Sequence, residues 1–163
     1  MNDDHNLIDN SEIFSNSSKR ISFKQIVVGS SDYDRELALR DLILRKPIGR
    51  TIFDDPLDLE VNDYHLGMYS NEDLIGILIL TKLTDDIVKM RQVVVDSDYQ
   101  KLGYGREMIR RIEKVAKELG YKKITLHSRK HVEAFYKQLG YETMGKEFIE
   151  VGMQHVEMQK DLV

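Results

Sequence analysis

Residues 93–106 combine a β-branched run, a polar turn and the start of an amphipathic helix, in the order Val93, Val94, Val95 and then Gln100, Lys101, Leu102, Gly103, Tyr104, Gly105, Arg106. Glycines at such a turn let backbone N–H groups approach a ligand, because no Cβ stands in the way. The first amides of a helix lack internal partners, and the helix dipole adds partial positive charge there. The segment therefore predicts a site for a pyrophosphate on a ligand with a long arm.

Two better-known glycine loops do not fit these residues. The turn lacks the Gly-Lys-Ser/Thr ending of a P-loop, which places a lysine and a hydroxyl for a nucleoside triphosphate and Mg²⁺. It also lacks Gly-x-Gly-x-x-Gly, and no acidic residue ends a following strand to hold a ribose. Taken alone, Gly103-x-Gly105 is equally compatible with a tight turn that only starts a helix.

Two blocks of sequence together resemble one family. Gln100-x-x-Gly103-x-Gly105 after a Val-rich strand resembles the acyl-CoA loop of the GCN5-related N-acetyltransferase (GNAT) superfamily. The block from Ile124 to Tyr141, which includes Phe135-Tyr136, is similar to the next strand and helix of that superfamily. The resemblance is specific from about Leu74 to Met158, and the ending after Gly152 is similar to a bacterial subgroup of uncharacterised members.

Composition narrows the class of protein. Residues 1–19 are rich in Asn, Asp and Ser, which predicts a flexible tail. The chain of 163 residues carries one set of motifs, which predicts a single acetyltransferase domain over 20–163. Cysteine is absent, so disulfides, thiolate metal sites and a cysteine nucleophile are excluded. The net charge of −4 argues against nucleic acid. The longest apolar run is too short to span a membrane and no secretory signal is recognisable, so we expect a cytoplasmic protein.

The apolar periodicity predicts the order β-α-β-β-β-α-β-α-β-β, an α/β fold with a GNAT-like central mixed sheet and helices on both faces. The clearest helix is Tyr104 to Leu119, with one apolar stripe and Gly120 as its C-cap. The first helix starts near Ser31 and stops at Pro47. We expect residues 51–63 to form an acidic, solvated loop. Strands are expected at 21–28, 65–69, 74–82, 87–95, 123–127, 141–146 and 153–159.

The resemblance implies acetyl-CoA as co-substrate, without a metal. It implies that the strand Val93–Val95 splays from its neighbour and offers backbone groups to the pantetheine arm, one N–H polarising the thioester carbonyl, while Val94 faces the core. Gln100, Lys101, Leu102, Gly103, Tyr104, Gly105 and Arg106 would surround the pyrophosphate. His131 stands where the family often has an asparagine that binds pantetheine, and the trio Arg129–His131 alternatively meets CoA phosphates.

The resemblance also implies one catalytic residue, Tyr136, as the acid that protonates the departing thiolate. A phenol has a pKa of about 10 and is a protonated donor at neutral pH. The alternative is that Tyr136 only packs its helix onto the sheet. The general base stays open among Glu60, Glu72 and the strand histidines His65, His127 and His155. These histidines are scattered, so we expect no metal site.

The function expected from these features is acetyl transfer to a primary amine of a small molecule or peptide by direct attack. The alternative is a non-catalytic acyl-CoA-binding module or sensor, which needs the loop but not Tyr136. Acetylation of protein termini or lysines ranks lower, because no peptide-binding signature is recognisable. Acidic residues 54–60 hint at a cationic acceptor. A homodimer is compatible with the sequence.

Overall fold

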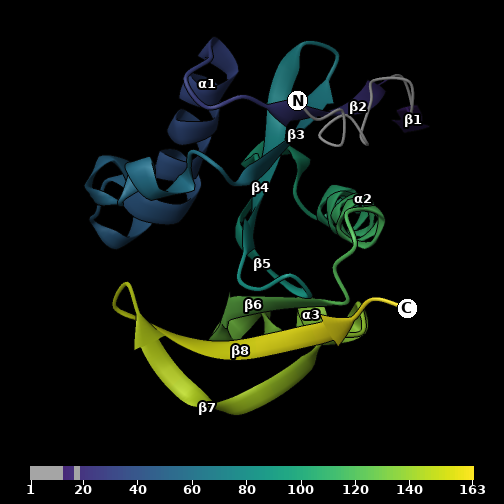
Figure 1. Ribbon diagram of the computed structural model, residues 1–163. Helices are drawn as coiled ribbons and strands as arrows, with labels where there is room; N and C mark the ends of the chain where they lie inside the picture. Colours follow the sequence, from purple (N-terminus) through teal and green to yellow (C-terminus); the bar gives the residue numbers. More distant parts are fainter. Residues whose placement is uncertain (1–12, 17–18) are drawn as a thin grey trace.

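A computed structural model describes residues 13–16 and 19–163 (Figure 1). Eight strands form one mixed sheet in the order β1-β2-β3-β4-β5-β6-β8-β7. Their bounds are β1 Ile13–Asn16, β2 Lys19–Ile26, β3 Tyr64–Ser70, β4 Asp73–Lys82, β5 Ile87–Val95, β6 Lys123–Arg129, β7 Glu142–Glu150 and β8 Met153–Asp161.

Three α-helices cover the two faces of this sheet. In Figure 1, α1 (Ser31–Arg40) lies on one side of β3–β5 and α2 (Tyr104–Glu118) lies on the other. The third helix, α3 (Glu133–Gln138), packs into the same core as α2. Short turns of helix complete the chain: the π-helical η2 Asp41–Arg45 and the 3₁₀ turns η3 Lys46–Ile48, η4 Ile52–Asp54, η5 Leu57–Glu60, η6 Ser97–Tyr99 and η7 Lys130–Val132.

The predicted α/β class, the strand and helix order and the mixed sheet with helices on both faces are confirmed from β2 onward. Strand β1, which pairs antiparallel with β2, falls inside the segment predicted as a tail. The rest of that segment lies outside the described residues, and the single domain over 20–163 stays a prediction. The first helix begins as expected, with Ser30 rather than Ser31 capping the amide of Tyr33 at 3.2 Å.

The sheet separates two apolar clusters. The larger one holds the α2 stripe (Met108, Ile109, Ile112, Val115, Ala116) against the sheet, as its periodicity predicts. The smaller one holds Leu37 and Leu39 of α1 against Ile77 and Val94. Strand β4 is covered on both faces, because Leu78 belongs to the α2 cluster and Ile77 to the α1 cluster.

Strands β5 and β6 form the one parallel pair among the described strands. Their register runs from Ile87 opposite Lys123 to Met90 opposite Leu126 and ends there. Strand β5 continues to Val95 along β4, and β6 continues to Arg129 along β8. The two strands therefore diverge after Met90, and the edges of both strands beyond that residue face a gap in the sheet.

Residues 51–63 differ from the predicted acidic, solvated loop. They contain the short helical turns η4 and η5, and Ile52 and Glu60 are buried. Asp55 pairs with Arg45 at 2.8 Å, and the carboxylate of Asp41 accepts the amide of Ile52 at 2.8 Å. Asp41 is thus a cap and Asp55 a counter-charge, roles that depend on partners distant in sequence, whereas Asp54 and Asp58 are exposed.

A buried charge cluster joins this segment to α1 and β3. The Arg40 guanidinium, fully buried, donates to Glu36 at 2.9 Å and to both oxygens of Glu60 at 2.5 and 3.1 Å. Tyr33 donates to Glu60 at 2.8 Å. Burial disfavours the charged carboxylate, but the hydrogen bonds and charge of Arg40 prevail and lower the pKa of Glu60.

His65 completes the cluster as an imidazolium. Its Nδ1 lies 2.9 Å from a Glu36 carboxylate oxygen and its Nε2 lies 2.9 Å from the Glu60 carbonyl oxygen. Both partners are acceptors, so both ring nitrogens carry hydrogen. Burial opposes the charge, but the bonds and charges of Glu36 and Glu60 outweigh it and raise the pKa of His65 above 6.5.

We expect the free energy of unfolding to decrease as the pH rises above the ordinary histidine pKa. A group whose pKa is raised by folding stabilises fully below its unfolded pKa, about 6.5, and loses that contribution as the pH rises through its folded pKa. The slope is at most about 1.4 kcal/mol per pH unit for one proton. In His65→Gln, urea denaturation over the same pH series should lose this slope. An equal pH dependence in the two proteins would show that His65 is neutral when folded.

Candidate active site

The gap between β5 and β6 lies directly before the predicted loop. Two residues of β5, Gln92 and Val93, oppose the single residue Leu78 of β4, since the register shifts between Ile77 opposite Val94 and Ile79 opposite Arg91. This is a β-bulge, which bends a strand and re-aims its side chains. After it, Val94 faces the α1 cluster and is buried, as predicted, while Val93 and Val95 pack toward the α2 cluster.

The glycine loop is open to solvent at the start of α2. Gly103 is the N-cap, with φ 89°, and a Cβ built on it would meet no atom within 4 Å. Gly103 has no side chain to cap the helix, and no described residue accepts the amide hydrogens of Gly105 and Arg106. Lys101 also has a positive φ, 64°. The loop thus presents unpaired backbone donors at the positive end of the α2 dipole, which suits an anion.

The side chains of the loop fall into two groups. Gln100 donates its amide to the Val95 carbonyl oxygen at 2.8 Å and so closes the turn over the end of β5. Lys101, Leu102 and Arg106 are exposed, whereas Tyr104 is buried in the α2 cluster. Tyr104 therefore anchors the helix start by its side chain, and any contact with a phosphate falls to the loop's backbone and the two exposed basic side chains.

Helix α3 meets the loop through Phe135. A Cβ on Gly105 would lie 3.7 Å from Val95 and 3.8 Å from Phe135, so the end of β5, the start of α2 and α3 converge there. The next residue, Tyr136, is 7% exposed, and its ring makes edge contacts with Phe135 and Tyr141 at 5.2 and 5.7 Å between centroids. Burial raises the pKa of Tyr136, which keeps the phenol protonated.

The predicted basic trio does not act together. Arg129 donates to the Leu44 carbonyl oxygen at 3.0 Å, and Lys130 pairs with Glu133 and Glu147 at 2.7 and 3.1 Å. His131 is exposed in η7. These contacts direct Arg129 and Lys130 to protein partners, so the trio forms no common phosphate site, and His131 stays a predicted cofactor contact.

A polar group that the sequence interpretation did not assemble lies on the opposite face of the sheet from α2. His127 Nδ1 lies 2.9 Å from the Glu150 carboxylate and 3.3 Å from Lys89 Nζ. His127 follows the last residue of β6 that pairs with β5. Burial lowers the pKa of Lys89. The alternation of side chains in β5 and β6 could have predicted that Lys89 and His127 share one face of the sheet. It could not have predicted the contact with Glu150, which is distant in sequence.

The other candidate bases are engaged elsewhere. Glu60 and His65 belong to the buried Arg40 cluster, and both ring nitrogens of His65 have acceptors. His155 is 4% exposed, with Nδ1 at 2.9 Å from the Met153 carbonyl oxygen. Glu72 is exposed in a turn. His127, with 28% of its side chain exposed, is thus the histidine of this set that borders both the gap and solvent.

One group of residues has the spacing of metal ligands. Ligand atoms of Glu36, Glu60 and His65 all lie within 4.8 Å of one another, and all three residues are buried. The Arg40 guanidinium bonds to both carboxylates, and His65 donates from both nitrogens. Arg40 therefore already supplies the charge that a cation would bring, and these residues fit an ion-pair cluster better than a metal site.

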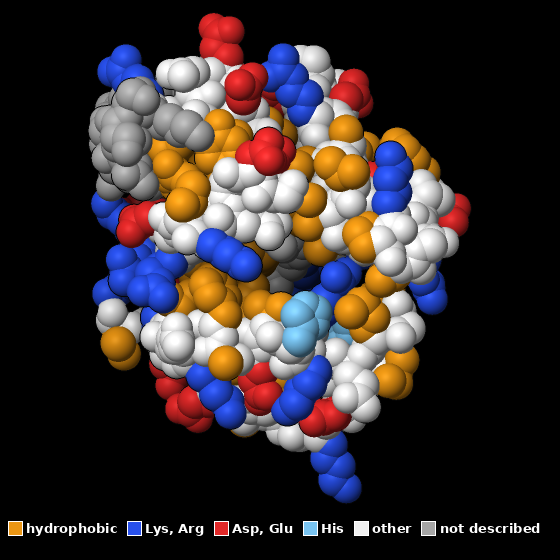
Figure 2. Space-filling view, turned by 180° about the vertical axis from the view of Figure 1, so that it is seen from behind, with side chains coloured by type: hydrophobic (Ala, Val, Ile, Leu, Met, Phe, Trp, Pro, Cys, Tyr) orange, Lys and Arg blue, Asp and Glu red, His pale blue; other side chains and the backbone are white. Residues whose placement is uncertain are grey.

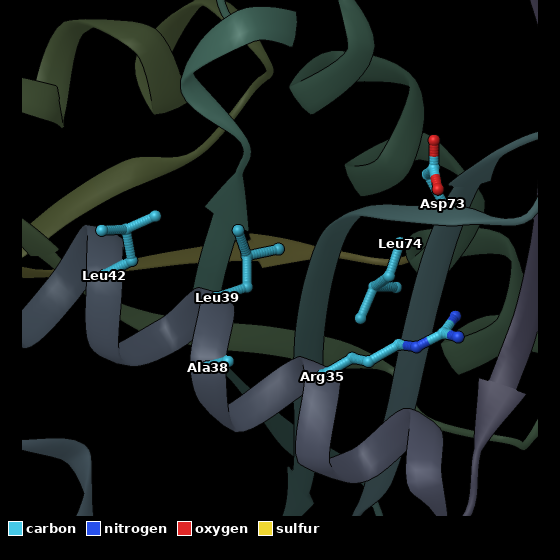
Figure 3. A pocket seen from close by; sticks show the side chains of 6 residues that line it. All are labelled: Arg35, Ala38, Leu39, Leu42, Asp73 and Leu74. Carbon is cyan, nitrogen blue, oxygen red and sulfur yellow. The ribbon is translucent and has the colours of Figure 1, made fainter.

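Two surface pockets lie away from the place where β5, α2 and α3 converge. One, about 340 Å³, is formed by α1, η2 and the start of β4 (Figure 3) and is lined by Arg35, Ala38, Leu39, Leu42, Asp73 and Leu74. The other, about 600 Å³, lies over β2 and β3. Neither shares a residue with the glycine loop. Figure 2, which views the molecule from behind Figure 1, shows a hollow near the middle of that face, with histidine and basic side chains along its edge.

None of the helices in the described part of the chain is both long and apolar enough to cross a bilayer.

Comparison with known proteins places this architecture in a family. The model of the acetyltransferase (GNAT) domain matches residues 51–162. The uncharacterized protein YyaT of Bacillus subtilis is 27% identical over 110 residues, covering 68% of this chain and 74% of the relative. An acyl-CoA N-acyltransferase from Pseudomonas aeruginosa superposes with a TM-score of 0.73 at 21% identity, over 88% of this chain and 99% of that one. A GNAT family acetyltransferase from Elizabethkingia anophelis with acetyl-CoA bound gives 0.66 at 15% identity, over 87% and 98%.

A mixed sheet that opens beside a glycine-capped helix defines the class of protein as an acyltransferase fold. Because the family model covers more than half of the chain, the chain belongs to the GNAT acetyltransferase family. The predicted family and the prediction of an acetyltransferase enzyme are confirmed. The match to the family model begins at residue 51, whereas the resemblance seen in the sequence motifs begins at about Leu74. The family match therefore also includes part of the segment between α1 and β3.

We expect Gly103→Val to weaken acetyl-CoA binding by more than about tenfold, or 1.4 kcal/mol, because a side chain then occupies the open space over the helix amides. Gly120→Val is the matched control. Gly120 has φ 97°, and its Cβ would also meet nothing within 4 Å, but it lies at the other end of α2.

Both variants carry a similar backbone strain, on the order of 1–2 kcal/mol, so their melting temperatures should decrease together. Calorimetric titration with acetyl-CoA then separates them. Equal affinities in the two variants would remove the glycine loop from the binding site.

Proposed function

We propose that this chain transfers the acetyl group of acetyl-CoA to a primary amine of a small molecule or peptide, by direct attack of the amine on the thioester. The observation that carries the proposal is the end of β5–β6 pairing at Met90 and Leu126, beside the open amides of the glycine loop. A gap of this kind can take an extended pantetheine arm between two strand edges, with the pyrophosphate at the start of α2.

In this proposal the backbone does most of the cofactor binding. Val93 and Val95 flank the gap, and an N–H of this strand polarises the thioester carbonyl as negative charge develops on its oxygen. Gly103, Gly105 and Arg106 offer amides to the pyrophosphate, with Lys101 and Arg106 adding charge. The neighbour from Elizabethkingia anophelis, which has acetyl-CoA bound, supports acetyl-CoA as the co-substrate.

Tyr136 is the proposed acid for the departing thiolate. It lies next to Phe135, which borders Gly105, and no described residue offers its hydroxyl a hydrogen bond. Burial keeps the phenol protonated, and in the same apolar surroundings a thiolate is also a stronger base than in water, so Tyr136 can hydrogen-bond to the departing sulfur and give it the proton. In the transfer the amine nitrogen forms a bond to the acetyl carbon and loses one proton to the base, the carbon–sulfur bond breaks, and sulfur takes the phenolic proton. Solvent then carries a proton from the base back to Tyr136.

His127 is the proposed base for the amine. If Nδ1 donates to Glu150, the neutral ring presents Nε2 as an acceptor, and no described residue bonds to Nε2. Lys89 lies beside His127 and adds positive charge, which disfavours the protonated form of the substrate amine and so favours its free-base form. Of the acidic residues in 54–60, Asp55 and Glu60 are paired with arginines, which leaves the exposed Asp54 and Asp58 to favour a cationic acceptor.

The test of the function is release of free CoA from acetyl-CoA in the presence of a panel of acidic, neutral and cationic primary amines. The chain has no cysteine, so a thiol reagent reads CoA without background from the protein. We expect amine-dependent release. Acetyl-CoA binding in a calorimeter without release by any amine would favour the alternative, a non-catalytic acyl-CoA-binding module.

We expect Tyr136→Phe to lower the turnover rate by about 100-fold, the lower end of the range for general acid catalysis, because water can partly replace the phenol. Acetyl-CoA affinity should stay close to that of the parent, since the ring remains. Tyr141→Phe is the matched control: this neighbouring buried tyrosine donates to Glu113 at 2.7 Å, so its loss should reduce stability and leave the rate unchanged. Equal rates for the two variants would return Tyr136 to a packing role.

A further inference from the structure

Gln92 holds an unusual backbone conformation next to the proposed thioester site. Its φ is 56°, in the left-handed region that glycine adopts most readily. It is the first of the two bulge residues that oppose Leu78. A residue with a side chain is strained in such a conformation and persists there only where its surroundings impose it. Some contact in the structure must therefore hold Gln92 in place.

That contact comes from the buried charge cluster. The Arg40 Nε donates to the Gln92 side-chain oxygen at 3.2 Å. The other two nitrogens of the guanidinium are already engaged by Glu36 and by both oxygens of Glu60. Because the guanidinium is planar and its donors form a fixed fork, these bonds leave Nε one direction in which to point. The carboxylates thus aim Arg40 at the bulge.

The bulge decides how the rest of β5 faces the gap. Val88 and Met90 belong to the α2 cluster, and unbroken alternation would place Val94 there as well. The extra residue shifts the alternation, so Val94 faces α1 while Val93 and Val95 face α2. In a strand the N–H and C=O of each residue point to the same neighbouring strand, and the direction alternates from residue to residue. The same shift therefore determines which backbone groups of Val93–Val95 turn toward the gap.

We propose that Arg40 and Gln92 are positioning residues for acetyl transfer: Arg40 holds Gln92 in the bulge, and the bulge aims the backbone groups of β5 that hold the acyl thioester. This rests on the proposed function, because it assumes that the thioester lies along Val93–Val95. Neither side chain touches the reacting atoms. Their contribution is to fix the strand geometry before the co-substrate arrives, so that binding does not have to impose it.

A pair of variants at Gln92 tests this link in the full-length chain. Gln92→Met keeps an unbranched side chain of similar length but removes the acceptor for Arg40 Nε. Gln92→Glu keeps an acceptor oxygen at the same distance along the side chain. Both variants place a residue with a side chain where the parent has a positive φ, so they differ from each other in the acceptor offered to Arg40. Melting temperatures of the two variants report any general loss of folding.

The expected result is a split between binding and rate. Gln92→Met should lower CoA release at saturating acetyl-CoA by about 100-fold, the effect of a displacement on the order of 1 Å at a reacting centre. Calorimetric affinity for CoA, which lacks the acetyl group, should stay within about threefold of the parent, whereas affinity for acetyl-CoA should decrease more. Gln92→Glu should restore most of the rate and the preference for acetyl-CoA.

Two outcomes overturn the inference while leaving the proposed function intact. One is a Gln92→Met protein whose rate and acetyl-CoA affinity match those of an active parent. The other is a Gln92→Glu protein that loses as much rate as Gln92→Met, since the acceptor is then not the feature that matters. A parent that neither binds acetyl-CoA nor releases CoA would overturn the proposed function, and the inference with it. The parent's own titration therefore identifies which of the two has failed.

Discussion

A guanidinium placed in an apolar interior must be met by negative partners, and this requirement organises one whole side of the molecule. Arg40 lies on α1 one turn beyond Glu36, but Glu60 has to come from the end of the segment that follows. That segment is therefore drawn back over the sheet, where Ile52 is buried. The Glu36 carboxylate also pairs with His65 as an imidazolium, and His65 donates as well to the Glu60 carbonyl oxygen, which fastens β3 to the same group. Removing one member would leave an uncompensated buried charge, the costliest kind of defect in such a cluster.

The cluster and the glycine loop serve the site from opposite faces of the sheet. On the α2 side, apolar packing fixes the helix and presents its first amides at the end of β5. On the α1 side, polar contacts fix the bulge just upstream in the same strand. Strand β5 is thus held from both faces over the few residues that border the gap. A site built largely from backbone groups needs this kind of support, because it has few side chains of its own that could adjust.

The sequence predicted the features whose determinants are local. The α2 stripe repeats every three to four residues, and Gly103 and Gly105 stand at a turn where glycine has a clear physical reason. The order of strands and helices followed from similar short-range patterns. The same reading failed for Glu60, which looked like part of a solvated acidic loop. Its burial depends on Arg40, twenty residues away at the end of α1, and nothing in the sequence around either residue shows that the two side chains meet.

Gln92 is the clearest case of information that a pattern cannot carry. The run from Ile87 to Val95 looks like a regular strand, and glutamine is not a residue that predicts a left-handed conformation. The bulge depends on a hydrogen bond to a residue on another element. The cluster around His127 was also missed as a unit, because Lys89, His127 and Glu150 come from three strands that become neighbours only through the strand order β5-β6-β8-β7.

The short parallel ladder between β5 and β6 also has a consequence for the mechanics of the fold. Four residue pairs join the five strands β1–β5 to the three strands β6, β8 and β7, so the sheet is narrowest where it opens. A ligand lying in that opening touches both parts and supplies the cross-links that the missing pairs would have made. Ligand that binds only the folded chain adds about 2.7 kcal/mol of stability at a concentration 100 times its dissociation constant. In the proposed arrangement the co-substrate is therefore also a strut between the two parts of the sheet.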